Sequence, residues 1–138
     1  MKRLMFRTVN AVHGGLYRRS GGKMGGTMHG VPILLLRTRG RKSGKEYTTP
    51  LMFGRDGDNL VLVASKGGDP RNPAWYHNLH AGEADVQIGH EHLRVRARDA
   101  AGGERERLWN QMVAVYPPYA GYQRKTTRQI PVVVLEPF

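Results

Sequence analysis

The chain has 138 residues, of which 39% are hydrophobic, so it is long enough for one folded domain and too short for two independent cores. No apolar run approaches the roughly 20 residues that span a bilayer, and the absence of cysteine excludes disulfides and thiolate metal sites. The net charge of +11 arises entirely in residues 1–45, which contain 11 Lys or Arg and no Asp or Glu, and this one-sided charge predicts an anionic partner.

The first predicted element is an amphipathic basic helix over residues 3–19. Apolar residues recur there at helical spacing among several arginines: Met5, Val9, Val12 and Leu16. Paired glycines follow and interrupt the pattern. We therefore divide the chain into an N-terminal basic helix (1–20) and a main domain (21–138). The helix has two expected binding surfaces, the main domain itself and, weakly, an anionic membrane.

The main domain is predicted to consist mostly of hairpins. Strands are expected at 31–38, 47–53, 60–65, 85–89, 92–98 and 130–135, and helices at 74–81 and 104–115. Leu108, Met112 and Val115 form one apolar stripe on the second helix. Six strands in hairpins with few helices indicate a mainly β (α+β) fold, a small antiparallel barrel rather than a parallel sheet.

A basic turn joins the first two predicted strands. Five cations stand in the nine residues from Arg37 to Lys45, together with two glycines. Glycines let backbone N–H groups approach an anion, and Arg and Lys add charge-assisted hydrogen bonds to its oxygens. Phosphate binding and an ordinary solvated hairpin tip both fit this segment.

Two aromatic segments are candidates for a ligand cavity. Ser65-Lys66-Gly67-Gly68 ends a strand and is followed by Trp75 and Tyr76, which would wall a planar ring or fill the core. Tyr116, Tyr119 and Tyr122 recur every three residues, a spacing that brings their rings together on a helix or tight turn. Neither the histidines nor the carboxylates show the spacing of a metal or paired-acid site, so we expect no metal.

Taken together, these segments resemble the deazaflavin-dependent nitroreductases, a family that includes F420-dependent quinone reductases. The resemblance runs from about residue 14 to the end of the chain and rests on six ordered motifs: Leu36–Gly44, Thr49–Leu51, Ala64–Gly68, Pro73–Leu79, Val115–Gln123 and Ile130–Val134. It implies a split β-barrel of the FMN-binding type that binds coenzyme F420, an 8-hydroxy-5-deazaflavin with a phosphate and an oligoglutamate tail. FMN is the alternative coenzyme.

The resemblance also implies roles for individual residues. Arg41, Lys42 and Ser43 would hold the phosphate, and Ser65 and the three tyrosines would face the acceptor. The remaining cofactor-binding positions by the same resemblance are Gly44, Thr49, Pro50, Ala64, Ser65, Lys66, Gly67, Trp75, Tyr76 and Asn78. The implied activity is hydride transfer from the reduced deazaflavin to a quinone or to another electron-poor conjugated or nitroaromatic acceptor.

Two other functions would also use the basic residues, nucleic-acid binding and non-catalytic coenzyme binding. A nucleic-acid-binding surface would have aromatic residues among its cations, whereas most aromatic residues here lie in the electroneutral part of the chain, so no nucleic acid is expected. A non-catalytic binding or carrier protein for F420 or a flavin nucleotide stays open, because binding and catalytic residues overlap. The expected location is cytoplasmic, with peripheral contact at the inner face of the membrane if residues 3–19 dock there. The sequence sets no oligomeric state.

Overall fold

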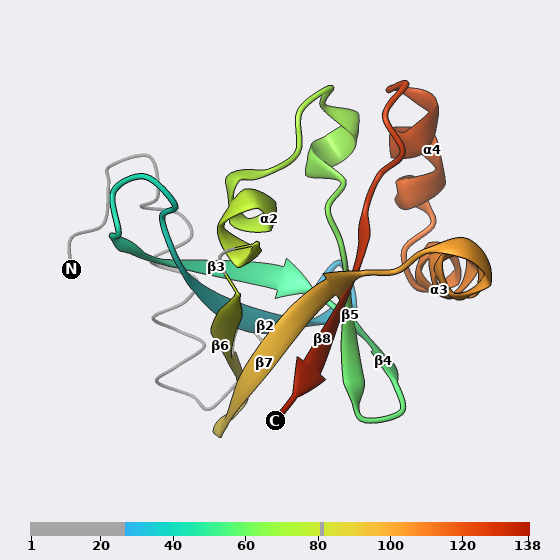
Figure 1. Cartoon of the computed structure of the whole chain (residues 1–138). Coiled ribbons are helices and arrows are strands. Elements are labelled where there is room, and N and C mark those ends of the chain that lie inside the picture. Colours follow the sequence, from blue (N-terminus) through green and yellow to red (C-terminus); the bar gives the residue numbers. More distant parts are fainter. Residues whose placement is uncertain (1–26, 81) are drawn as a thin grey trace.

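The computed structural model describes residues 27–80 and 82–138, and these residues form eight strands with helices beside them (Figure 1). The predicted helix over 3–19 and the glycines after it lie outside the described residues. The strands are β1 (Thr27–Met28), β2 (Val31–Arg39), β3 (Glu46–Met52), β4 (Gly54–Asp56), β5 (Asn59–Val63), β6 (Glu83–Ile88), β7 (Glu91–Asp99) and β8 (Val132–Pro137). The helices are the short 3-10 helix η2 (Lys66–Gly68) and the α-helices α2 (Ala74–Leu79), α3 (Gly102–Val115) and α4 (Pro118–Arg124).

The strands form a mainly antiparallel half-barrel. The order is β1-β2-β6-β7-β8-β5-β4, and β3 pairs with β2 outside this path. Strands β2 and β3 make a long hairpin from Ile33 opposite Met52 to Arg39 opposite Glu46, and the predicted basic turn lies at its tip. In Figure 1 this tip extends on the side of α2, while α3 and α4 lie on the other side of the molecule.

Strands β5 and β8 are buried on both faces, because alternate side chains enter two different cores. Leu60 and Leu62 point into the barrel core with Leu34, Leu36 and other apolar residues. Val61 and Val63 point the other way, into a second core beneath α3 and α4. This arrangement explains why both strands read as continuous apolar runs in the sequence.

Several elements differ from the sequence-based expectation. Two short strands were not predicted, β1 and β4. The expected apolar stripe on α3 is wrong at its last position. Leu108 and Met112 are fully buried, but α3 ends at Val115, whose side chain is 41% exposed, and Tyr116 packs on the core instead.

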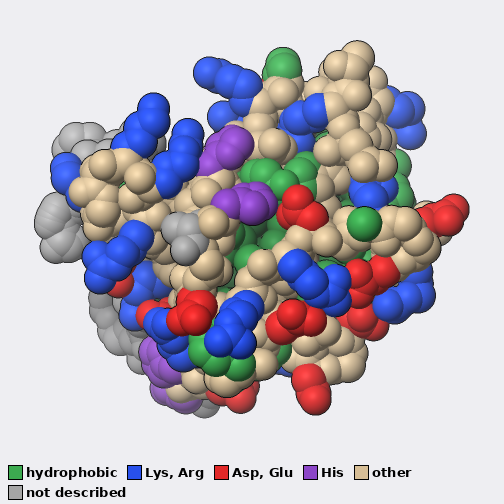
Figure 2. Space-filling model, in the orientation of Figure 1, with side chains coloured by type: hydrophobic (Ala, Val, Ile, Leu, Met, Phe, Trp, Pro, Cys, Tyr) green, Lys and Arg blue, Asp and Glu red, His purple; other side chains and the backbone are tan. Residues whose placement is uncertain are grey.

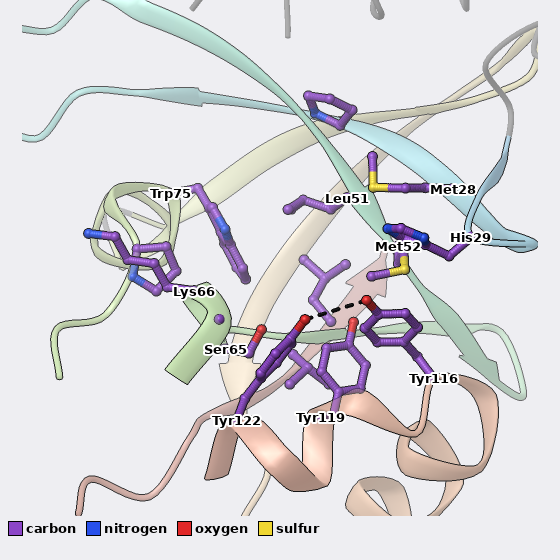
Figure 3. Close-up of a pocket in the computed structure, with 15 residues that line it drawn as sticks. Met28, His29, Leu51, Met52, Ser65, Lys66, Trp75, Tyr116, Tyr119 and Tyr122 are labelled. Carbon is purple, nitrogen blue, oxygen red and sulfur yellow. Dashed lines mark hydrogen bonds between the residues drawn. The ribbon is translucent and has the colours of Figure 1, made fainter. Parts of the chain in front are cut away.

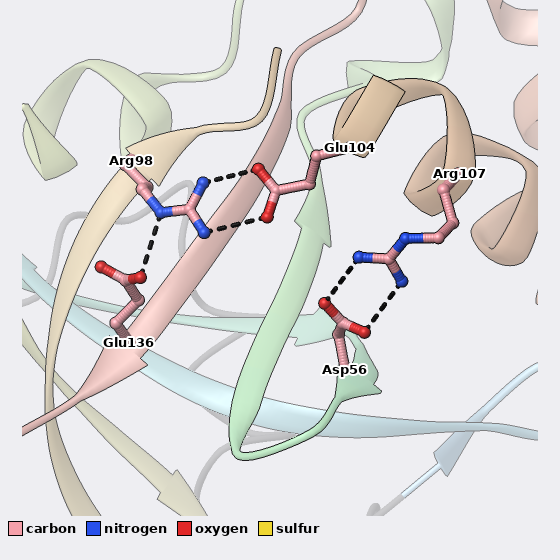
Figure 4. A network of polar contacts seen from close by, with 5 residues as sticks. All are labelled: Asp56, Arg98, Glu104, Arg107 and Glu136. Carbon is pink, nitrogen blue, oxygen red and sulfur yellow. Dashed lines mark hydrogen bonds and ion pairs between the residues drawn. The ribbon is translucent and has the colours of Figure 1, made fainter. Parts of the chain in front are cut away.

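Ion pairs join α3 to the sheet (Figure 4). Arg98 on β7 binds Glu104 through two hydrogen bonds of 2.6 and 2.9 Å and Glu136 on β8 at 3.1 Å. Arg107 makes a second bidentate pair with Asp56 on β4, at 2.9 and 3.1 Å. These bonds fix the start of α3 over the strands that carry its core. Within the described residues, no helix is long and apolar enough to cross a membrane.

Candidate functional site

A cavity of about 380 Å³ opens between the end of β3, the turn after β5 and helix α4 (Figure 3). Its apolar lining comes mainly from β3, β5, the start of α2 and the β1–β2 turn, and its polar groups come from the Ser65 turn and α4. The lining residues are Met28, His29, Pro50, Leu51, Met52, Leu62, Val63, Ser65, Lys66, Gly67, Pro73, Trp75, Tyr116, Tyr119 and Tyr122. A planar apolar ligand with a few polar atoms fits such a lining.

Three tyrosines form one wall of this cavity, as their spacing predicted. Pro117 and Pro118 begin α4, and the helix then brings the rings of Tyr116 and Tyr119 to 5.0 Å between centroids. Tyr122 lies 6.3 Å from Tyr119, and its hydroxyl is 3.4 Å from that of Tyr116. In Figure 3 the phenol groups of Tyr119 and Tyr122 point from α4 into the cavity, and that of Tyr116 points into it from the connection between α3 and α4.

Two hydroxyl groups in the cavity have no hydrogen-bond partner among the described residues, those of Ser65 and Tyr119. Tyr119 is only 3% exposed and Ser65 9%. Burial raises the pKa of Tyr119, with a smaller contribution from Tyr116 and Tyr122, so its hydroxyl keeps its proton at neutral pH. Buried polar groups are normally paired, so these two hydroxyls are available to a ligand.

The turn that carries Ser65 has an unusual backbone. Lys66, Gly67 and Gly68 all have positive φ, at 46°, 62° and 86°. Gly68 also lies so close to α4 that a Cβ there would be 2.7 Å from the carbonyl oxygen of Tyr122. The turn therefore needs glycine at this position, and it packs directly on the helix that carries the tyrosines.

A second, smaller hollow of about 270 Å³ lies at the tip of the β2–β3 hairpin. It is lined by Gly40, Arg41, Lys42, Ser43, Tyr47, Ala74 and Asn78. The turn is closed by a backbone hydrogen bond, in which the Gly40 N–H donates to the Lys45 carbonyl at 2.7 Å. A Cβ on Gly40 would be 2.8 Å from the Ser43 hydroxyl oxygen and 2.9 Å from the Tyr47 ring, so a side chain there would displace both groups.

This hollow carries uncompensated positive charge. Among the described residues, neither Arg41 nor Lys42 has a carboxylate within 4.0 Å, whereas Arg37 is paired with Glu46 at 3.8 Å. The pKa of the nearby His77 is lowered, first by burial and then by the charge of Arg41. Figure 2 shows Lys and Arg side chains gathered around the hairpin tip, and the acidic side chains lie mostly elsewhere on this face.

Helix α2 joins the two hollows. Trp75 lines the larger one, and Asn78, one turn later, lines the smaller one and accepts a 3.2 Å hydrogen bond from the Arg41 backbone N–H. Tyr76 faces neither, because its hydroxyl donates to Asp99 at 2.6 Å and ties α2 to the end of β7.

The structure therefore divides the predicted site residues into three groups. Those in the larger cavity are Pro50, Ser65, Lys66, Gly67, Trp75, Tyr116, Tyr119 and Tyr122. Those in the basic hollow are Arg41, Lys42, Ser43 and Asn78. Gly44, Thr49, Ala64 and Tyr76 line neither: Gly44 closes the basic turn, Thr49 pairs with Leu36 in the sheet, and Ala64 is in the barrel core.

Sequence reasoning missed several residues of the larger cavity, among them Met28 and His29. These two come from the β1–β2 turn, where His29 adopts a positive φ of 53° and its ring lies 5.6 Å from that of Tyr116. The available signal was Gly30 before a β-rich run, because glycine readily adopts the positive φ of a tight turn. Nothing in the sequence indicated that this turn meets α4.

A family model described as F420H(2)-dependent quinone reductase matches residues 8–137. The chain belongs to this family. An F420H(2)-dependent quinone reductase of Mycobacterium tuberculosis is 42% identical to it over 130 residues, which cover 90% of this chain and 87% of that protein.

Solved structures agree with the family assignment. An F420-H2 dependent reductase superposes with a TM-score of 0.70 at 48% identity, covering 76% of this chain and 94% of that one. A pyridoxamine 5′-phosphate oxidase-like protein from Listeria innocua shares the fold alone, with a TM-score of 0.54 at 13% identity over 76% of this chain and 82% of that one. The sequence-based assignments to the split-barrel fold and to a family of deazaflavin-dependent reductases that use coenzyme F420 are confirmed.

Proposed function

We propose that this F420H(2)-dependent quinone reductase family member transfers a hydride from reduced coenzyme F420 to a quinone or to another electron-poor conjugated or nitroaromatic acceptor. The observation that carries the proposal is the placement of an acid-free basic hollow beside an apolar cavity into which the Ser65 and Tyr119 hydroxyls open. The F420-dependent names of the relatives support the choice of coenzyme.

The residues of the basic hollow fit a phosphate group. Arg41 and Lys42 would donate charge-assisted hydrogen bonds to its oxygens, and the Ser43 hydroxyl would add a neutral donor. The turn is already held by its own hydrogen bonds and by Asn78, so little ordering is needed on binding. Its surplus of positive charge suits a coenzyme with several negative charges.

The larger cavity would hold the ring system and the acceptor. Trp75, Pro50 and Met52 provide flat and apolar walls that keep two planar molecules in contact and exclude water. The deazaflavin, when bound, supplies a hydride from its C5 atom. The protein's contribution is to align the two planes across this cavity.

The polar groups of the cavity would act on the acceptor oxygen. Negative charge develops on a quinone carbonyl oxygen as the hydride arrives, and preorganised donors lower the energy of that state. The Tyr119 hydroxyl, whose pKa is raised by burial, stays protonated and can donate to this oxygen. Ser65 is the second candidate donor, and the paired hydroxyls of Tyr116 and Tyr122 complete the wall.

Binding measurements test the coenzyme assignment. Calorimetry with F420 and FMN should show much tighter binding of F420, with an affinity that falls as salt rises because the charge pairing is partly screened. Equal binding of FMN at low salt would rule out the deazaflavin assignment. Turnover with excess reduced F420 and menadione then separates an enzyme from a carrier protein, which would bind the coenzyme without turnover.

A tyrosine series tests the role of the wall. Tyr119→Phe keeps the ring and its packing, so coenzyme affinity should be unchanged, while the single-turnover rate with menadione should fall by about 10²–10³-fold if the donor is central. The fall would be several-fold if a water molecule replaces the hydroxyl. Tyr116→Phe and Tyr122→Phe are the matched controls. Rates equal to wild type in all three variants would show that the hydroxyls take no part.

A further inference from the structure

Arg128 lies between α4 and β8 in the chain. Its guanidinium makes four hydrogen bonds to the loop between β5 and α2. Nε donates to the Asp69 carbonyl at 2.9 Å, Nη1 to the Ala64 carbonyl at 3.2 Å and the Asn72 side chain at 2.7 Å, and Nη2 to the Ser65 carbonyl at 2.8 Å. One side chain thus holds both ends of the turn that carries the Ser65 hydroxyl.

Besides these bonds, the turn is held by a few backbone hydrogen bonds and by the packing of Gly68 on α4. Within the loop, the Gly68 N–H donates to the Ser65 carbonyl at 2.9 Å and the Asp69 N–H to the Lys66 carbonyl at 3.0 Å. Lys66 has a positive φ of 46°, a conformation that is unfavourable for a residue with a side chain. Such a conformation persists only where the surroundings fix it, and Arg128 contributes by hydrogen bonding to both ends of the turn.

Arg128 is itself fixed by helix α4. The Gln123 side chain donates to the Arg128 carbonyl at 2.7 Å and accepts from the Ile130 N–H at 2.9 Å. Gln123 is four residues after Tyr119 on the same helix. A continuous set of hydrogen bonds therefore runs from the helix that carries the Tyr119 hydroxyl to the turn that carries the Ser65 hydroxyl.

The geometry of these bonds requires an arginine. All four acceptors are neutral oxygens spread around one planar fork, and the Asp69 carboxylate is engaged instead by the Arg71 N–H at 2.8 Å. A lysine has the same charge but one nitrogen on a flexible stem, so it cannot reach the acceptors on both ends of the turn at once. Arg128→Lys therefore keeps the positive charge and removes the planar fork, so it separates the effect of charge from that of geometry.

We propose that Arg128 is a positioning residue for acceptor reduction, which holds the Ser65 hydroxyl at the place where it and the Tyr119 hydroxyl donate to the same acceptor oxygen. This inference rests on the proposed function, because it concerns the same cavity. Arg128 does not line the cavity and acts through Ser65.

Hydrogen exchange of the coenzyme-free chain tests the structural half of this proposal. The amides of Gly68 and Asp69 should exchange faster in Arg128→Gln and in Arg128→Lys than in wild type, with the strands unchanged. Arg105→Gln is the matched control, because Arg105 is also half-buried and donates to a nearby carbonyl, that of Ile130, at 2.7 Å without touching the turn. Unchanged exchange at both amides in both Arg128 variants would overturn the proposal whatever the coenzyme is.

A double-mutant cycle tests the catalytic half. Arg128→Gln should slow single-turnover reduction of menadione by about 10-fold or more while changing F420 affinity less than about 3-fold, and Arg128→Lys should not restore the rate. In a Ser65→Ala background the same change should cost less than about 3-fold, because residues that act as a unit are not additive. Additive losses, rescue by lysine, or a loss no larger than that of Arg105→Gln would each overturn it. A wild type that neither binds F420 nor turns over would instead refute the proposed function, and the exchange experiment would still decide the role of Arg128 in the turn.

Discussion

The close approach of the Ser65 turn to α4 leads to a sharp prediction for Gly68→Ala. Gly68 has a φ of +86°. A methyl group on its Cα would be 2.7 Å from the Tyr122 carbonyl oxygen and 3.0 Å from the Lys125 Cβ. The first of these neighbours is backbone, which cannot rotate away. The methyl group must therefore separate the turn from the helix.

The magnitude follows from two contributions. A side chain in the left-handed region costs about 1–2 kcal/mol, and forcing a group into a packed contact adds about 1–3 kcal/mol. Gly67 is a matched control, since its φ of +62° carries the first cost and a Cβ there meets nothing within 4 Å. We expect Gly68→Ala to lose about 2–5 kcal/mol of unfolding free energy and Gly67→Ala about 1–2 kcal/mol.

Urea denaturation followed by circular dichroism measures both variants. The comparison is valid if the slope of free energy against urea is the same in all three proteins. Gly68→Ala should also weaken acceptor reduction, because the displaced turn carries Ser65, whereas Gly67→Ala should do so less. Equal losses of stability in the two variants would show that the turn does not press on α4 as the structure has it.

Three further predictions concern the core, the ion pairs and the basic hollow. Leu108→Ala should cost about 2–5 kcal/mol in urea denaturation, since the side chain is fully buried, whereas Val115→Ala should stay within about 0.5 kcal/mol; similar costs would contradict the orientation of α3. The hydrogen bonds from Arg98 hold the pKa of Glu104 below its ordinary value of 4.5, so this stabilisation is present above that pH and is lost as pH falls through the lowered pKa. The melting temperatures of wild type and Glu104→Gln should therefore converge between neutral and strongly acidic pH, and a constant difference would refute the assignment. Lys42→Ala should weaken F420 binding in calorimetry by about 1.5–3 kcal/mol at low salt and by less at high salt, and an unchanged affinity would remove Lys42 from the phosphate site.

Local patterns predicted most of the sheet. The β2–β3 and β6–β7 hairpins were predicted because apolar runs alternate with glycine and charged turns, and β5 and β8 because they are apolar on both faces. Strand β1 and helix α4 were harder to identify. Two residues are too few for a periodic pattern, and the Tyr-Pro-Pro-Tyr segment fits a turn as well as a helix.

The contacts between distant segments could not be predicted from the sequence. The basic turn and the tyrosine series each had a local signature, but the hydrogen bonds from Arg128 to Ala64 and Ser65 join residues more than 60 positions apart. Tyr76 shows the same limit, because its neighbour Trp75 enters the cavity while its own hydroxyl binds Asp99. Side-chain direction on a single helical turn depends on packing that no local pattern records.

Helix α2 links ligand binding in the two hollows, because each hollow is lined by a residue of this helix. Trp75 and Asn78 lie three residues apart on this six-residue helix, so a group bound in either hollow restrains the same short element. Any conformational freedom that α2 loses when one hollow is filled is not lost again when the second is filled. Such linkage is reciprocal, so inorganic phosphate in the basic hollow should raise the affinity of the larger cavity for a ring fragment by the same factor as the fragment raises that of phosphate. The helix would thus make one coenzyme bind more tightly than the sum of its two parts.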